Sequence, residues 1–338
     1  MLSTLKRAGA VVLVVLPLFV PEMIIELTWL RPDAALLIAG MLPALFGWRY
    51  APSYGWAFVP IAAAFNAAAV TVFGHPVATT VVVAILAVLV GLSAIKGVHR
   101  VTSFLAAQPA ITVIAGYHTV SLSGVTPGIF GQAIMSAVTV AIGAIWALLV
   151  AAVLLRGENS GPPDPVPAPA VALYVGALLL LLTPIAFVAS MWFLNTTAGW
   201  IMLTILLVTR PSYAESWTMI MQRAVGTVIG GVLAAGGAVL VSDTAILITL
   251  GTLAMVVALV LLLLHVRYVY FAILITAAIV LLNAQRANVF HTAANYLLYT
   301  ITGVVLVAGV VASVQAALGR RTAAHRRDGQ SCAATDGR

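Results

Sequence analysis

The sequence predicts an all-α integral membrane protein with about twelve transmembrane helices, arranged in two weakly repeated six-helix halves with both termini in the cytoplasm (N-in/C-in). Composition is the first observation, because 63% of the 338 residues are hydrophobic and 7% are charged, whereas soluble domains have about 25% charged residues. The second observation is a series of long apolar stretches, and the third is the placement of Lys and Arg between them. This composition excludes a water-soluble globular protein.

The apolar stretches define the predicted spans, since a helix of about 20 apolar residues crosses the ~30 Å hydrocarbon layer. The first stretch follows Lys6 and Arg7 and has no small-x-small cleavage pattern, so we interpret it as a retained span and not as a cleaved signal. The expected spans of the first half are 8–28, 34–48, 54–73, 76–96, 101–117 and 128–155. Those of the second half are 171–193, 197–209, 222–242, 244–264, 268–284 and 293–318.

Composition also divides the chain into four parts. The first transmembrane half, residues 1–155, is followed at 156–170 by a cytoplasmic linker whose closely spaced prolines favour extended structure. The second transmembrane half covers residues 171–319. The remaining segment, 320–338, is polar and basic, and its shortage of apolar residues predicts a disordered cytoplasmic tail.

Matching landmarks indicate that the two halves are repeats. Ala-Pro-Ser-Tyr at 51–54 corresponds to Arg-Pro-Ser-Tyr at 210–213, and each follows the short second span of its half. His99 and Arg100 precede the fifth span, as His265 and Arg267 precede the eleventh. Because each half has an even number of spans, both halves are expected to enter the membrane from the same side, as parallel repeats do.

The basic residues give the orientation, because cytoplasmic loops collect Lys and Arg. With the N-terminus inside, Arg31 and Arg286 alone among the 16 Lys and Arg residues fall on the outer side. The net charge of +7 is therefore explained by orientation in a plasma membrane, and no nucleic-acid partner is expected. The single cysteine, Cys332, excludes an intrachain disulfide and a thiolate metal cage.

Two acidic residues in the first predicted span are candidates for proton coupling. Glu22 and Glu26 are four residues apart and so lie on one face of a helix. A charge at the centre of a span costs about 2.5–3.5 kcal/mol, and less near the interface, so such residues often serve transport. The alternative is that Glu26 is interfacial and Glu22 is hydrogen-bonded to a neighbour.

Two arginines are candidates for substrate binding at the cytoplasmic mouth. Arg210 follows the eighth span and Arg223 opens the ninth, and a guanidinium group binds a planar carboxylate through two parallel hydrogen bonds. The alternative for both residues is ordinary anchoring by positive charge in a cytoplasmic loop. Glu215 lies within reach of Arg223 as an ion-pair partner.

Other polar and small residues complete the candidate site. Gly226 and Gly230 form a stripe that favours close helix packing, and Thr227 between them could hydrogen-bond a ligand or a neighbouring helix. Asn66, near the middle of the third span, could line a substrate path or join two helices. The second, fifth, eighth and eleventh spans are short, as in transporters with interrupted helices at a central path, although ordinary tilted helices explain them equally well.

No cofactor and no metal site are expected. His75, His118 and His291 lack the spacing of metal ligands on one helix. The chain also has no phosphate-binding Gly-rich loop and no nucleophile elbow. An enzyme is therefore not expected.

The pattern Arg223-x-x-Gly226-Thr227-x-x-Gly230, after an apolar span and a Pro-Ser loop, resembles the fusaric acid resistance protein (FUSC) family of the aromatic acid exporters. The specific match covers about thirty residues, and the arrangement of six spans, linker and six spans is similar over the whole chain. The first half lacks the Arg-x-x-Gly-Thr pattern, and the linker replaces the cytoplasmic domain that many members have.

The resemblance implies a secondary transporter that exports small organic anions, such as aromatic or other weak carboxylic acids, with coupling to protons as an option. Its expected partners are the lipid bilayer and the anion. A passive anion channel and a non-transporting membrane scaffold are the alternatives. The sequence leaves the oligomeric state open, with a homo-oligomer among the options.

Overall fold

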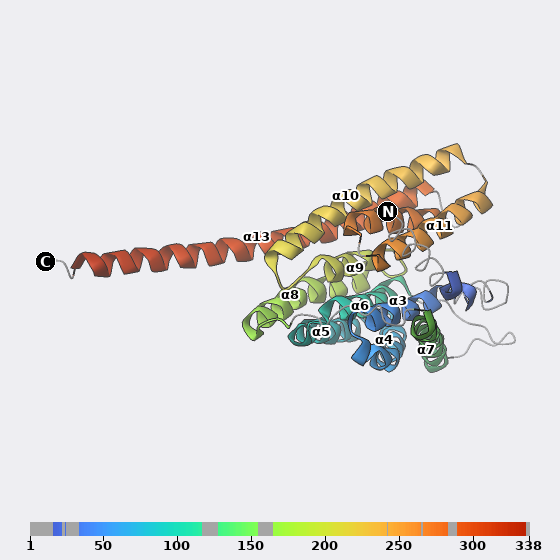
Figure 1. The fold of residues 1–338 in the computed structure, drawn as a ribbon, viewed down its shortest axis with the longest axis horizontal. Helices are drawn as coiled ribbons and strands as arrows, with labels where there is room; N and C mark the ends of the chain where they lie inside the picture. The colour runs from blue at the N-terminus through green and yellow to red at the C-terminus, as the bar shows by residue number, and fades with distance from the viewer. Residues whose placement is uncertain are drawn as a thin grey trace.

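The computed structural model describes residues 16–21, 24, 34–116, 128–154, 165–241, 243–264, 266–282 and 289–335, and over these residues the chain is helical and contains no strand. Before the linker lie α3 (Ala34–Tyr50), η2 (Pro52–Ala57), α4 (Phe58–Val72), α5 (Pro76–Ser93), η3 (Ala94–Lys96), α6 (His99–Ala115) and α7 (Ile129–Leu154). After it follow α8 (Ala168–Trp192), α9 (Gly199–Val208), α10 (Tyr213–Leu240), α11 (Thr244–Leu263), α12 (Tyr268–Leu282) and α13 (Val289–Thr335), as Figure 1 shows.

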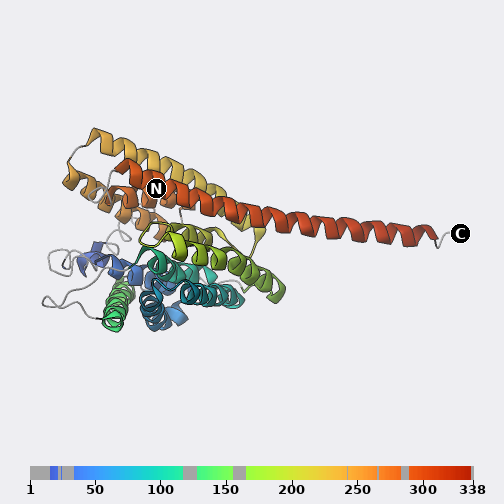
Figure 2. The same cartoon turned by 180° about the vertical axis from the view of Figure 1, so that it is seen from behind.

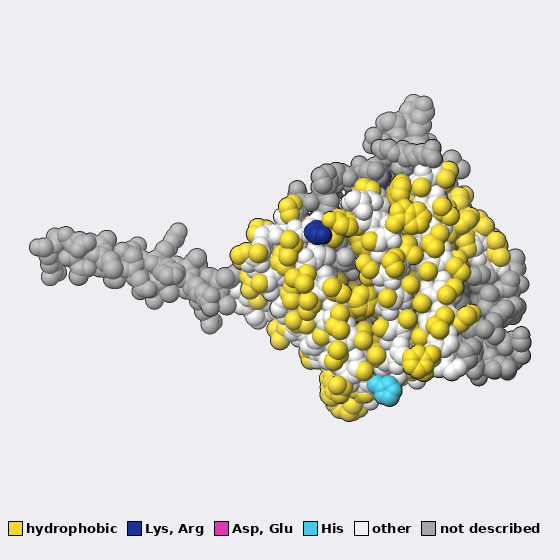
Figure 3. All heavy atoms as spheres, turned by 90° about the horizontal axis from the view of Figure 1, so that it is seen from below, with side chains coloured by type: hydrophobic (Ala, Val, Ile, Leu, Met, Phe, Trp, Pro, Cys, Tyr) yellow, Lys and Arg dark blue, Asp and Glu magenta, His cyan; other side chains and the backbone are white. Residues whose placement is uncertain are grey.

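The protein is an all-helical, multi-pass membrane protein. In the part of the chain described above, 6 helical segments are long and apolar enough to cross a bilayer, namely Pro52–Val72, Pro76–Lys96, Ile129–Leu154, Ala168–Trp192, Tyr213–Leu240 and Ala293–Ala316. Figure 3 shows one face of the molecule covered by hydrophobic side chains with very few charged groups. Such a surface is stable against lipid chains and not against water.

The predicted second to twelfth spans each coincide with a helix, but the ninth begins earlier than predicted. α10 starts at Tyr213 and not at residue 222, because nothing between these positions breaks a helix. Ser212 is extended at its N-cap, and Glu215 in the first turn interacts favourably with the helix dipole. The low hydropathy of residues 213–221 instead predicts a loop. The predicted first span, 8–28, lies largely outside the described residues.

The C-terminal segment also differs from the prediction. α13 continues as one helix to Thr335, where the polar composition at 320–338 predicts disorder, and Figures 1 and 2 show it projecting from the helical bundle. Its frequent Ala and Arg residues have high helix propensity, so a polar sequence here continues a helix. Of the predicted linker, residues 156–164 lie outside the described part of the chain.

The same helix pairs pack together on both sides of the linker. α3 packs against α7, and α4 packs against α6 and α7. At the corresponding positions, α9 packs against α13, and α10 packs against α12 and α13. Contacts of α5 with α8 and of α6 with α9 join the two sets of helices, as Figures 1 and 2 show.

The four helices expected to be short are short in the structure: α3, α6, α9 and α12 have 17, 17, 10 and 15 residues. α6 and α9 lie at the centre of the molecule, where Ala110 and Val113 join a core with Met202 and Leu206. Because these helices are surrounded by protein, their ends do not expose backbone polar groups to lipid. Short helices can therefore form the centre of a membrane bundle.

Successive connections between helices lie at opposite ends of the bundle. At one end, Lys96 lies 5.3 Å from the ring of Tyr54, Val166 N–H donates to Ala94 O over 3.0 Å, and Arg100 contacts Glu215. At the other end, Asn195 N–H donates to Ile114 O over 2.8 Å. We call the first the basic end, because Lys96, Arg100 and Arg210 gather there.

Candidate functional site

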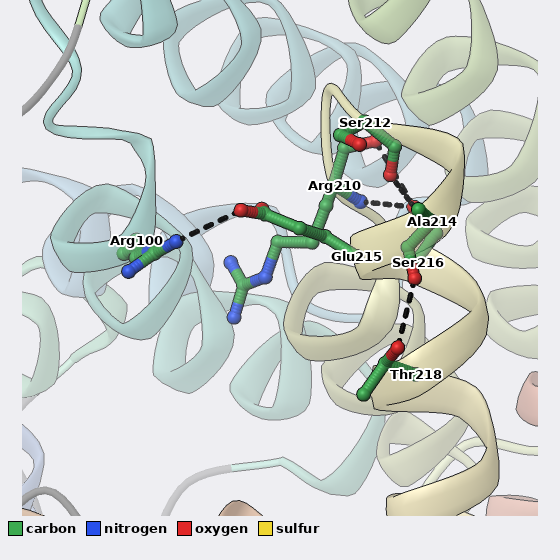
Figure 4. Close-up of polar contacts among 7 residues, drawn as sticks. All are labelled: Arg100, Arg210, Ser212, Ala214, Glu215, Ser216 and Thr218. Atoms are coloured by element: carbon green, nitrogen blue, oxygen red, sulfur yellow. Dashed lines mark hydrogen bonds and ion pairs between the residues drawn. The ribbon is translucent and has the colours of Figure 1, made fainter.

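The connection between α9 and α10 holds Arg210 in a fixed position. Pro211 follows Arg210 and cannot continue α9, so the chain turns here. The backbone N–H of Arg210 donates to Ser216 Oγ over 2.9 Å, and the Ser216 hydroxyl lies 3.1 Å from Arg210 O. Ser216 is 1% exposed, and Figure 4 shows it on the first turns of α10 facing this connection. The Ser216 hydroxyl thus supplies hydrogen bonds to the backbone of this connection, where Pro211 ends the helical hydrogen bonding.

The guanidinium group of Arg210 is buried and incompletely paired. Its Nη1 has no hydrogen-bond partner among the described residues. Burial lowers the pKa of Arg210 below its ordinary value, since removal from water disfavours the charged form. Tyr174, Tyr268 and Glu215 are close enough to interact with it electrostatically. Arginine keeps its proton under such conditions, so a positive charge with a free N–H group lies inside the protein.

A cavity of about 250 Å³ lies between α8, the start of α10 and α13, and Arg210 lines it. Its polar groups are at the α9–α10 connection, where Tyr174, Thr209 and Ser216 join Arg210. Its other walls are apolar and are formed by Ala172, Leu173, Ala177, Leu180, Leu181, Val307, Val310, Val311 and Val314. Such a cavity fits a molecule with one anionic group and an apolar body.

Glu215 pairs with Arg100 and not with Arg223. Arg100 Nη2 donates to Glu215 Oε1 over 3.2 Å, joining α6 to α10, and Figure 4 shows Glu215 reaching Arg100 across the Arg210 side chain. The two side chains are 58% and 48% exposed, so water screens this pair. The prediction failed because α10 begins at Tyr213, which places Glu215 on the helix two turns from Arg223.

Arg223 lies inside α10 and not at its start, about 15 Å along the helix from Tyr213. It is 1% exposed. Its Nη2 donates to the hydroxyl of Tyr296 on α13 over 2.8 Å, and Tyr268 at the start of α12 also interacts with it. Its Nε and the Tyr268 hydroxyl make no hydrogen bond of good geometry with the described residues, although the Tyr268 hydroxyl is close enough to the guanidinium group to interact with it. Arg223 is therefore a buried cation with a free donor, too deep in the bundle to serve only as an interfacial anchor.

Threonine hydroxyls without partners lie on α10 and on three helices that contact it. Thr227 lies one turn after Arg223 on α10 and is fully buried, and its Oγ1 has no hydrogen-bond partner in the described structure. The same holds for Thr204 on α9, Thr276 on α12 and Thr300 on α13. Buried threonines in helices usually donate to the carbonyl four residues earlier, as Thr112 does to Gln108 O over 3.1 Å. The fold thus leaves the hydrogen-bonding capacity of these four hydroxyls unused.

Gly226 and Gly230 bring α12 close to this part of α10. A Cβ at Gly226 would lie 2.5 Å from the Cβ of Ala272, and one at Gly230 would collide with the backbone oxygen of Ile273. Because real side chains do not approach so closely, only glycine allows this packing at the two positions. The close approach puts Tyr268, at the start of α12, level with Arg223.

The structure does not bring the remaining predicted residues to this site. Asn66 is buried on α4, where its Nδ2 donates to Ala62 O over 3.1 Å and its Oδ1 has no partner among the described atoms. α4 packs against α6 and α7, far from α10 in both ribbon views. Glu22 and Glu26 lie outside the described residues.

The sequence reasoning missed the aromatic and imidazole groups near the two arginines. Tyr174, Tyr268 and Tyr296 come from three helices, and a tyrosine in an apolar span is not distinctive in sequence. His99 had a signal, since it marks the repeat. It is 6% exposed, neither ring nitrogen has a partner in the described part, and its ring lies 6.0 Å from that of Tyr174.

Three comparisons with known proteins complete the description. Residues 185–310 match the family model described as fusaric acid resistance protein-like, a segment that runs from the last third of α8 into α13 and contains Arg210 and Arg223. The resemblance found in the sequence is thereby confirmed. No curated protein and no solved structure matches the chain significantly.

Proposed function

Because its residues 185–310 belong to the fusaric acid resistance protein-like family, whose members have a membrane transport or efflux role, we propose that this protein exports small organic anions. The proposed mechanism is that of a secondary transporter. The protein would have twelve spans in the cell inner membrane, with both termini in the cytoplasm. The proposed substrates are aromatic or other weak carboxylic acids. A proton would be coupled through Glu22.

One observation supports an anionic substrate above all others. Arg223 is buried in a helix long and apolar enough to cross the membrane, with its Nε free and the Thr227 hydroxyl unpartnered one turn away. A charge within a span is costly to insert, by about 2.5–3.5 kcal/mol at the centre, so it is retained where it serves function. A carboxylate that accepts hydrogen bonds from Nε and from Thr227 would offset this cost.

The position of Arg210 supports a route toward this site. Arg210 lies at the basic end, which carries the positive charge expected on the cytoplasmic side. Tyr268 interacts with both Arg210 and Arg223 and thus connects the two cations. The anion would bind first at Arg210, pass Tyr268 and reach Arg223.

The repeated packing supports alternating access between the halves. The contacts of α5 with α8 and of α6 with α9 are the places where one half would rotate against the other. The Arg100–Glu215 pair crosses this boundary at the basic end and is exposed, so it can open at low cost.

Proteoliposomes with an imposed pH gradient test the proposal. We expect protein-dependent flux of labelled benzoate, at least a tenfold loss of flux in Arg223→Gln, and near-normal flux in Lys96→Gln, which removes an exposed charge at the same end. Thermal unfolding of the purified variants separates loss of function from loss of fold. Absence of flux for a broad panel of carboxylic acids contradicts the proposal, and current that reverses at the anion equilibrium potential without a pH gradient identifies a channel.

A further inference from the structure

The cavity beside Arg210 is bordered by exposed apolar side chains of α8. Leu173 and Leu180 on α8 border it and are 54% and 64% exposed. At 1.5 Å per residue, Gly176 lies about 12 Å from the start of α8, deeper than the polar interface, which is about 6 Å thick. Exposed leucines at this depth are bordered by acyl chains, and so is the edge of the cavity that they form.

The polarity of the cavity matches that of an amphipathic acid dissolved in a leaflet. Arg210 and Ser216 are at the α9–α10 connection, whereas Leu181 and Val307 lie farther along α8 and α13 toward the membrane interior. A weak acid in a bilayer has the same arrangement, with its carboxylate at headgroup level and its apolar body among the chains. Such a molecule can enter sideways without turning over.

We infer that the protein takes amphipathic carboxylates directly from the bilayer through this cavity, and that Gly176 sets the largest apolar body admitted. The inference rests on the proposed function and specifies its substrates and their route. The carboxylate binds at the polar end of the cavity, which Arg210 lines, and the apolar body lies between α8 and α13.

The size of the cavity and the space above Gly176 support this limit. An apolar cavity of about 150 Å³ binds benzene, so about 250 Å³ accommodates a substituted ring or two fused rings. Gly176 lines the cavity, and a Cβ built on it would meet nothing within 4 Å. A larger side chain at this position therefore meets no other helix, and because Gly176 lines the cavity we expect it to occupy part of that space.

Binding of benzoate and 2-naphthoate to the protein in nanodiscs tests the size limit. We expect Gly176→Leu to weaken 2-naphthoate binding at least tenfold and benzoate binding by less than threefold, and Arg210→Gln to weaken both. Gly309→Leu on α13 is the matched control, because it is exposed, has equal free space and lies outside the cavity lining. Equal effects of the two leucine variants overturn the role of Gly176.

A fluorophore on Gly176→Cys, with Cys332→Ser, tests the route. Phospholipids brominated in their acyl chains should quench it strongly and aqueous iodide weakly, and 2-naphthoate should reduce the quenching by bromine. Strong quenching by iodide with little by bromine means that the cavity opens to water, and the bilayer route is then wrong. Binding without flux in proteoliposomes contradicts the transport proposal and leaves this site standing, so the two failures are distinguishable.

Discussion

Thr227 is a residue whose hydroxyl we expect to contribute to ligand binding and not to folding. Its hydroxyl is fully buried and has no hydrogen-bond partner in the described structure. A buried hydroxyl without a partner costs about 1–3 kcal/mol, so the folded protein gains nothing from it. A ligand that accepts a hydrogen bond from the Thr227 hydroxyl would offset this cost when it binds. The buried hydroxyls of Thr204, Thr276 and Thr300 extend the same argument to three neighbouring helices.

We therefore expect Thr227→Val to leave thermal stability unchanged or raise it, and to weaken the apparent affinity for the transported anion about fivefold to tenfold, the worth of one hydrogen bond of about 1–1.4 kcal/mol. Thermal unfolding in detergent and concentration-dependent flux in proteoliposomes measure the two effects. Thr112→Val is the control, because Thr112 is buried and does donate, to Gln108 O, so that variant should lose stability and keep its affinity. A destabilised Thr227→Val protein would show that the hydroxyl serves the fold.

At the scale of the elements, the packing of α10 against α12 decides where the site residues meet. Gly226 and Gly230 let the two helices approach until Tyr268 reaches the level of Arg223. Lipid chains already solvate apolar side chains, so two helices in a membrane gain little from burying them against each other. Small residues allow the backbones to approach closely, and the van der Waals contacts of this close packing stabilise the pair.

Gly230→Ala should accordingly destabilise the protein by about 1–3 kcal/mol, since even one methyl group would collide with the backbone oxygen of Ile273. Gly237→Ala on the same helix meets nothing within 4 Å and should be neutral or stabilising by up to about 1 kcal/mol, the helix propensity of Ala over Gly. Thermal unfolding of both variants measures the difference. Equal stabilities would mean that α10 and α12 do not approach as closely as the structure shows.

Most of the helices could be predicted from sequence because crossing lipid imposes a length and a hydropathy on them. The start of α10 could not, since Glu215, Ser216 and Gln222 lower the local hydropathy while remaining compatible with a helix. That error placed Arg223 at the mouth of the site and suggested an ion pair with Glu215. With the start of α10 at Tyr213, Arg223 lies about 15 Å along the helix, and Glu215 forms its ion pair with Arg100.

For the whole molecule, the boundary between the two sets of helices is the place where a transport cycle would move. The Arg100–Glu215 pair crosses it over 3.2 Å at the basic end. Both side chains are about half exposed, so the pair adds at most about 1 kcal/mol and is not a structural lock.

A covalent link at this point should therefore stop transport. With Cys332→Ser, we expect a short bismaleimide to join Arg100→Cys to Glu215→Cys and to reduce flux more than tenfold, while each single-cysteine variant treated in the same way keeps its flux. A shift in electrophoretic mobility reports the link, and ligand binding reports the fold. Full transport by the linked protein would contradict movement at this boundary.

The sequence by itself determined that the chain is a multi-pass helical membrane protein with a segment similar to the FUSC family, and it pointed to two arginines as candidates for the site, because hydropathy, loop charge and a local motif are properties of continuous stretches. Only the tertiary structure decided which groups meet there. Tyr296 contacts Arg223 from α13, and Tyr268 lies near both arginines from α12. The cavity beside Arg210 requires three helices at once. Such contacts depend on helix depth and rotation, which packing sets and hydropathy does not.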